Sequence, residues 1–185
     1  MEIKGTAVKS IPEHVRAHYP DRYKEWLDSL PAESQKIFKE GVITANWYDV
    51  DKAAIIPTQK VGELFFNNAN KGAWQSGRYS AEQALNGIYK LYVKFSSPGH
   101  IIERASRVFS AYYSGSEMQV VNKEEKSVEV EIVKFSKPNQ IIEHRIGGWM
   151  ERALEISGCK DVKVVISKSL AKGDAKTLYN ITWPC

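Results

Sequence analysis

The sequence predicts a single α+β domain in which helices pack on a twisted antiparallel sheet of about five strands. Two patterns near the C-terminus indicate this class. Apolar residues recur at helical spacing up to Leu154, and after Gly158 two segments alternate in polarity, 162–166 and 178–183. A length of 185 residues with 43% hydrophobic residues suits one core spanning residues 1–185. The expected parts are an N-terminal strand with short helices (1–45), central helices (50–115), and a hairpin, helix and closing hairpin (117–183).

The N-terminal part begins with an alternating segment, residues 2–9, which predicts a short strand. Ser10, Pro12 and Glu13 then form a helix-start pattern with proline in the first turn. Proline breaks at Pro20 and Pro31 divide the rest of this part into two or three short helices.

The central part is helical. Pro57 predicts a kink or a new helix start, because proline cannot donate the helical hydrogen bond. Ser80, with Gln83 at the capping-box position, predicts the start of an amphipathic helix that extends to Phe95. The segment 96–99 ends that helix, and another broad apolar face follows over 101–113.

The spacing of apolar residues then changes from the helical period to a period of two residues. Met118 and Val120 precede a charged turn, and Val128 to Ile132 alternate with glutamates, so we expect a hairpin with one wet face. Pro138 starts the last helix. Gly147 and its neighbour Gly148 lie inside that helix without the glycine and lysine pattern of a phosphate loop, so we expect them to permit close packing.

Composition narrows the function. The formal net charge is +4, and residues 51–115 hold eight basic against four acidic residues. These basic residues are dispersed, which favours a solvated helix face over a nucleic-acid partner. The two cysteines and the absence of a signal peptide predict a reduced, cytoplasmic protein without disulfides. No apolar run is long enough for a transmembrane helix, so membrane contact is expected to be peripheral at most.

The histidines offer little chemistry. His14 and His18 share the i, i+4 spacing of a metal pair, but no third ligand is evident, and surface histidines are the favoured interpretation. His100 at a helix start and His144 are candidates for haem ligation, again against an ordinary exposed role. No nucleophile elbow, phosphate loop or Cys-x-x-Cys pair is present, so we predict no catalytic residue, no metal and no enzyme activity.

Aromatic residues are concentrated in the central and C-terminal helices, where they can line an apolar ligand cavity or simply form the core. The predicted ligand-lining residues are Trp74, Ile88, Tyr92, Phe109, Tyr112, Trp149 and Met150.

Several short motifs together carry a family resemblance. Residues 147–158, 162–166 and 172–183 resemble the end of the 4-vinyl reductase type of domain, whose superfamily includes haem nitric-oxide-binding domains and small TRAPP vesicle-tethering subunits. More specifically, a poorly characterised bacterial family in that superfamily is similar at residues 3–7, 80–85, 87–89, 103–105, 109 and 112–113. The resemblance implies helices on an antiparallel sheet, often a dimer, and in some relatives an interior that holds an apolar molecule or acyl chain.

Two departures from the family patterns shape the functional prediction. Thr177 stands where 4-vinyl reductase domains often carry cysteine, and residues 76–80 have the letters of the haem domains' Tyr-x-Ser-x-Arg signature in the wrong order. We therefore predict a non-enzymatic sensor for a hydrophobic or acyl ligand in bacterial signalling, with no cofactor and haem only as a minority alternative. The other interpretations are a dimeric interaction or scaffold domain with a solid core and a haem sensor using His100 or His144. The ligand, the partner and the pathway stay open.

Overall fold

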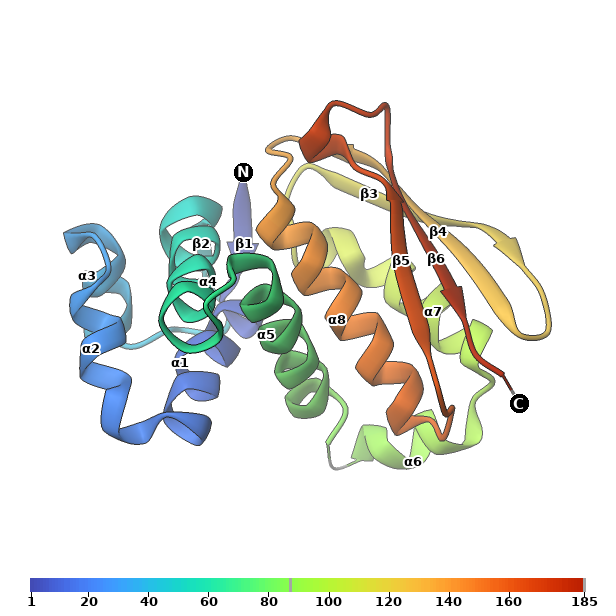
Figure 1. Cartoon of the computed structure of the whole chain (residues 1–185), viewed down its shortest axis with the longest axis horizontal. Coiled ribbons are helices and arrows are strands. Elements are labelled where there is room, and N and C mark those ends of the chain that lie inside the picture. The colour runs from blue at the N-terminus through green and yellow to red at the C-terminus, as the bar shows by residue number, and fades with distance from the viewer. Residues whose placement is uncertain (87, 185) are drawn as a thin grey trace.

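We describe a computed structural model of the chain, which covers residues 1–86 and 88–184; the side chains of Ile88, Tyr89 and Tyr92 also lie outside the description. An N-terminal helical layer lies at one end, and a sheet backed by helices lies at the other (Figure 1). Two long helices, α5 (Ala69–Ala84) and α8 (Gln140–Ile156), run side by side between these parts.

The N-terminal layer corrects the first predicted element. Strand β1 covers only Glu2–Lys4, and helix α1 begins at Gly5, so Ser10 and Pro12 lie inside the helix. The physical reason is the loop that packs on the start of α1: its Asn46 and Thr44 carbonyl oxygens accept from the Gly5 and Thr6 amides, at 2.8 and 3.2 Å. The rest of the layer comprises α1 (Gly5–His18), a 3-10 turn (Pro20–Arg22), α2 (Tyr23–Asp28), α3 (Ala32–Glu40) and β2 (Trp47–Asp49), which pairs antiparallel with β1.

Of the two alternatives predicted for Pro57, a kink or a new start, the structure shows a change of helix type within a continuous helical stretch. Pro57 lies in the first turn of α4 (Ile56–Val61), and a π-helical turn flanks this short helix on each side, at Asp51–Ile55 and Gly62–Phe66. The second π turn presents Phe65, whose ring stacks on Tyr19 at 4.1 Å between centroids. These turns therefore attach the α4 region to the end of α1.

The helix predicted from Ser80 to Phe95 is wrong in its bounds. Ser80 lies inside α5, which is capped at its start by Asn68, whose side chain accepts from the Lys71 amide at 2.9 Å. The helix ends at Ala84, because the backbone of Leu85 leaves the helical region. The following helices are α6 (Ile88–Phe95) and α7 (Pro98–Val108), with a 3-10 turn at Phe109–Ala111.

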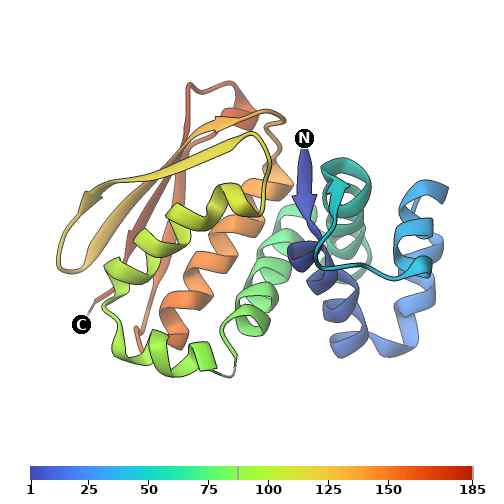
Figure 2. The same cartoon turned by 180° about the vertical axis from the view of Figure 1, so that it is seen from behind.

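The C-terminal hairpins and helix are confirmed, but the predicted wet face of the first hairpin is not fully exposed, because Glu131 is only 7% exposed and pairs with Lys176. The four-stranded antiparallel sheet has the order β3-β4-β6-β5, with Val130 opposite Tyr179 and Val164 opposite Ile181. Its strands are β3 (Ser116–Lys123), β4 (Ser127–Phe135), β5 (Lys163–Lys168) and β6 (Thr177–Thr182). The described residues thus form six strands in two sheets, not about five in one. Helices α7 and α8 cover one face of the larger sheet (Figure 2).

Helices α5 and α8 approach to backbone contact. A Cβ on Gly77 would lie 1.9 Å from the Arg145 carbonyl oxygen, and one on Gly148 would lie 2.1 Å from the Trp74 carbonyl oxygen. The prediction that Gly147 and Gly148 permit close packing is therefore confirmed. Among the described residues, no helix is both long and apolar enough to cross a membrane.

Candidate functional site

A group of buried polar side chains lies where α1, α5 and α8 meet, and we call it the buried polar junction. It consists of Ser10 and His14 on α1, Ser76 on α5, Arg145 on α8, and Tyr113 just before β3. Three elements far apart in sequence therefore bring polar groups into the interior, where each group needs a partner to offset the loss of water.

Arg145 is the unusual member of the junction, because it is only 3% exposed and still incompletely paired. Its Nη2 donates to the Ala7 carbonyl oxygen and to Ser10 Oγ, both at 2.8 Å, whereas Nη1 has no partner among the described residues. Burial lowers the pKa of Arg145, although the Tyr113 hydroxyl acts in the opposite direction. No described carboxylate pairs with this guanidinium, so the junction contains a buried positive charge without a counter-ion.

His14 is held in its neutral form beside this charge. Its Nδ1 lies 3.3 Å from Ser76 Oγ, and its ring stacks on Tyr79 with centroids 5.1 Å apart. Burial lowers the pKa of His14 from 6.5 to about 4, and the nearby charges of His18 and Arg145 contribute in the same direction. At neutral pH the junction therefore carries the charge of Arg145 and none from His14.

The His14 and His18 rings do lie together, 5.0 Å apart in an edge arrangement. Nδ1 of His18 is engaged with the His14 carbonyl oxygen at 3.2 Å. Across the described parts of the chain, no three His, Cys, Asp or Glu side chains gather in a way that could hold a metal. The pair instead forms an aromatic cluster with Tyr79.

Sequence reasoning missed Arg145, although one signal was available. The residue lies on the apolar stripe of α8, between Ile142 and Trp149, where a charge is out of place. Its partners could not be found in the same way, because Ala7 and Ser10 are 138 and 135 residues away in sequence.

Three of the predicted ligand-lining residues lie around α8. Met150 is buried in the main core, and Trp149 packs between this core and a smaller cluster around Val93. Trp74 covers the α8 backbone, and its Nε1 donates to Glu151 Oε2 at 2.8 Å.

The remaining predicted lining residues are divided between interior and surface. Phe109 is buried in the main core beside Tyr113, with ring centroids 5.0 Å apart, whereas Tyr112 is 37% exposed. The side chains of Ile88 and Tyr92 lie outside the described residues. The ligand-binding role of the whole set stays a prediction.

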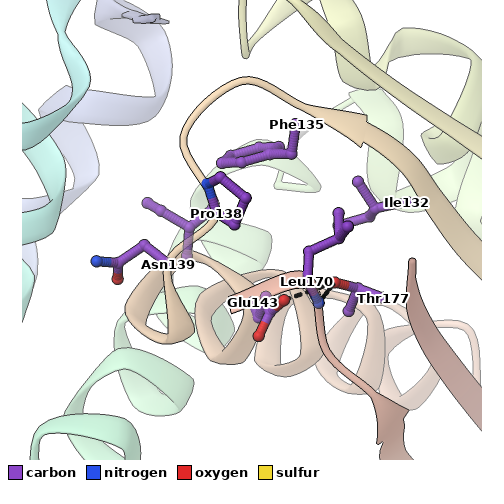
Figure 3. A pocket seen from close by; sticks show the side chains of 8 residues that line it. Ile132, Phe135, Pro138, Asn139, Glu143, Leu170 and Thr177 are labelled. Carbon is purple, nitrogen blue, oxygen red and sulfur yellow. Dashed lines mark hydrogen bonds between the residues drawn. The ribbon is translucent and has the colours of Figure 1, made fainter. Parts of the chain in front are cut away.

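A shallow hollow lies on the other side of α8, between the end of β4 and the β5–β6 connection (Figure 3). It has no room for a water molecule, and none of the predicted ligand-lining residues whose side chains are described contributes to it. Its lining residues are Ile132, Phe135, Pro138, Asn139, Ile142, Glu143, Leu170 and Thr177.

The buried Glu143 carboxylate beside this hollow is fully engaged. It accepts hydrogen bonds from Ser169 Oγ at 2.6 Å, Thr177 Oγ1 at 2.5 Å and the Ala171 amide at 3.2 Å. These bonds tie the β5–β6 connection to α8, so Glu143 has a structural role.

The two other histidines do not point into an interior space. The His100 side chain is 53% exposed, with Nδ1 3.8 Å from Glu103 Oε2, whereas the buried residues of α7 include Ile101 and Ile102. Nδ1 of His144 lies 2.8 Å from the Gln140 carbonyl oxygen within its own helix.

Solved structures share the fold of this chain over their whole length. An H-NOX protein from S. oneidensis in the Fe(II)NO ligation state has a TM-score of 0.76 at 12% identity, covering 99% of this chain and 100% of that chain. The Fe(II) unliganded H-NOX protein from K. algicida has a TM-score of 0.72 at 10% identity, covering 99% and 97%. This chain has the H-NOX fold. No protein-family model and no curated protein matches the sequence.

The shared fold confirms the α+β class and, at the level of the fold, fits the haem nitric-oxide-binding part of the resemblance. The 4-vinyl reductase and TRAPP parts stay predictions. At these identities the likeness establishes the fold alone.

The prediction of no cofactor, with haem as a minority alternative, is corrected by these neighbours. Solved chains with the H-NOX fold include Fe(II) and Fe(II)NO states and subjects of work on haem distortion and haem redox potential. Haem is therefore the first cofactor to consider for this fold, and not a minor one.

The described residues nevertheless do not fit a haem in the arrangement shown. Axial ligation by histidine requires a ring that points to an interior space, whereas His100 faces solvent and Ile102 occupies a buried position of α7. A haem at α7 would require this helix to move from its present position.

Proposed function

We propose that this chain is a non-enzymatic sensor module in bacterial signalling, with the H-NOX fold and with a small ligand that has an apolar body and an acidic group. The observation that carries the proposal is Arg145, which is buried, unpaired at Nη1 and without a carboxylate partner among the described residues. A guanidinium binds carboxylates through two parallel hydrogen bonds, so an acidic group would supply the missing counter-charge.

The contacts of Arg145 connect such binding to a change of shape. The two hydrogen bonds that Nη2 donates both reach α1, at the Ala7 carbonyl and Ser10 Oγ. A ligand that enters at Nη1 must separate α1 from α8, because the junction is closely packed. Ligand binding and helix displacement would then be coupled. The ligand would bind the state with the helices apart more tightly than the state with the helices together, and this difference in affinity is what shifts the equilibrium between them. Phe109, beside Tyr113, offers an apolar contact for the body of the ligand.

The first test is thermal unfolding with a medium-chain fatty acid and, separately, an aromatic carboxylic acid. We expect one of these acids to raise the Tm of the wild-type protein, because a ligand that binds only the folded state stabilises it. Arg145→Met should lose this response. Arg152→Met is the matched control, since Arg152 lies on the same helix but pairs at the surface with Glu82 and Glu155. The absence of a Tm response to either acid, or an equal response in Arg145→Met, contradicts the proposal.

Haem is the second probe, because of the solved structures with this fold. Haem is added to the purified protein, and the absorbance in the Soret region is recorded for the wild type and for His100→Ala. A Soret band that depends on His100 would place the sensor site at α7 and would contradict the role proposed for Arg145. A spectrum equal to that of free haem leaves the acid ligand as the proposal under test.

A dimeric interaction or scaffold domain is the second candidate function, and the packed interior favours it. The hollow beside α8 has no room for water, as expected for a domain that acts through its surface. Light scattering after size exclusion measures the oligomeric state, and Tyr112→Ala with Arg107→Ala probes an exposed surface at the end of α7 and the turn that follows it. A monomer whose partners are unaffected by these changes contradicts this candidate.

A further inference from the structure

Helix α6 presents an apolar ridge to solvent, formed by Leu91 and Phe95. These side chains are 63% and 84% exposed and stand one helical turn apart, so they lie on the same side of the helix. Val93 is only 2% exposed and packs with Ile101 and Ala153. Because Val93 holds one side of α6 against the body of the protein, the ridge of Leu91 and Phe95 points away from it.

The ridge is accompanied by positive charge. Lys90 and Lys94 are both exposed and one turn apart, and neither forms an ion pair with any residue that the structure describes. The sequence contains no aspartate or glutamate between Glu82 and Glu103. Helix α6 also lies at the end of α8 away from β1, where the N-terminal layer does not cover it (Figures 1 and 2).

We infer that α6 docks on the surface of an anionic lipid bilayer. Apolar side chains of an interfacial helix enter the boundary between headgroups and acyl chains, and lysines beside them extend to the anionic headgroups. This inference does not depend on the proposed function of the buried polar junction.

The charges distinguish a lipid surface from a second copy of the chain. A two-fold contact between copies would use the same patch on both, and would bring the unpaired Lys90 and Lys94 of one copy toward those of the other. The shape distinguishes it from a protein partner. A stable protein interface buries roughly 800 Å² on each side, whereas the exposed apolar side chains described on α6 are Leu91 and Phe95, which fluid lipid can surround.

Co-sedimentation with vesicles tests the inference. The full chain is mixed at low salt with vesicles of phosphatidylcholine alone, or of phosphatidylcholine with phosphatidylserine in equal amounts. We expect binding to the mixed vesicles only, with loss of binding at high salt. The double variant Lys90→Gln/Lys94→Gln should have a vesicle partition coefficient roughly thirtyfold lower than the wild type. This factor combines the usual contributions of two basic residues near an anionic surface. Leu91→Ser with Phe95→Ser should reduce binding to the background level.

A matched control uses an exposed apolar residue elsewhere. Val165 on β5 is 57% exposed, and Val165→Ser should bind vesicles as the wild type does. Circular dichroism and Tm of each variant establish that it is folded. The inference is overturned if the wild type does not bind the mixed vesicles, or if the folded Leu91 and Phe95 variant binds as well as the wild type. Self-association through the ridge in the absence of vesicle binding would also overturn it, in favour of a second copy.

Discussion

Two buried charges lie two residues apart on α8 and face different neighbours. The Glu143 carboxylate accepts three hydrogen bonds from the β5–β6 connection and the first residue of β6, whereas Arg145 reaches α1 and keeps one nitrogen without a described partner. A satisfied buried group contributes to the architecture, while an unsatisfied one costs free energy in the folded state. This contrast is why the functional proposal rests on Arg145 and not on Glu143.

Replacing Arg145 should therefore cost little stability. We expect Arg145→Met to leave the free energy of unfolding unchanged or to raise it by about 1–2 kcal/mol, because an apolar side chain of similar length removes an unpaired buried charge. Urea unfolding followed by circular dichroism measures this change. A loss above about 3 kcal/mol, typical of breaking a satisfied buried pair, would show that the guanidinium is part of the architecture.

His14 predicts a pH dependence of stability. Its pKa is about 4 in the folded protein, below the ordinary value of 6.5, so the unfolded chain binds a proton more readily than the folded one. The contribution of neutral, buried His14 to the free energy of unfolding is fully present above pH 6.5 and is lost as the pH falls toward 4. A shift of this size corresponds to a loss of about 3 kcal/mol in unfolding free energy once the pH is below the folded pKa.

The measurement is urea unfolding at a series of pH values from neutral to acidic. His14→Asn keeps a polar group near Ser76 but cannot titrate, so this variant should show a flatter dependence over the same window. His18→Asn is the control, because the pair is adjacent but only His14 is strongly buried. An unchanged slope in His14→Asn would refute the assignment.

Packing between α5 and α8 gives a prediction for whole elements. Gly77→Ala and Gly148→Ala each place a methyl group against backbone that cannot give way, at 1.9 Å and 2.1 Å. We expect each to lower the free energy of unfolding by about 1–3 kcal/mol or more. Gly99→Ala is the control, since its Cβ would meet only the flexible end of Lys123, at 2.9 Å. Chemical unfolding of the three variants checks the order, and equal stabilities would contradict it.

Elements whose apolar residues have a clear period could be predicted from the sequence. Elements whose bounds depend on distant contacts could not. The hairpin of β3 and β4, the helix α8 and the closing hairpin all follow from local alternation or helical spacing. The start of α1 at Gly5 depends on a loop some forty residues later, through the hydrogen bond from the Gly5 amide to the Asn46 carbonyl oxygen. Ser80 resembled a helix cap, but α5 already passes through it from Asn68.

The same division applies to the candidate site. Aromatic concentration identified Phe109 and Met150, which are buried in the main core, but it did not identify a common cavity. Arg145 was recognisable only as a charge on an apolar stripe, and the groups that surround it come from α1, α5 and the segment before β3. Local sequence patterns carry no information about which distant helices meet.

At the scale of the whole molecule, the N-terminal layer and the sheet layer share α5 and α8, so we expect them to unfold together. Trp26 reports on the first layer and Trp183 on the second, and both are buried. One variant keeps Trp26 and lacks Trp183, and the other keeps Trp183 and lacks Trp26. In each variant the urea midpoint measured by fluorescence should equal the midpoint measured by circular dichroism, and the two variants should agree. Two separate midpoints would mean that residues 1–185 do not behave as the single domain predicted from the sequence.

The π turns on either side of α4 make the spacing of this region unusually sensitive to chain length. A π turn contains one residue more than an α turn, and this extra residue is accommodated within the turn itself. A single-residue deletion within Gly62–Phe66 would restore the ordinary helical period while swinging Phe65 away from the Tyr19 ring. Helical content would persist, but the aromatic stack that joins this segment to the end of α1 would be lost. In this segment, natural sequence variation should therefore substitute residues far more readily than it inserts or deletes them.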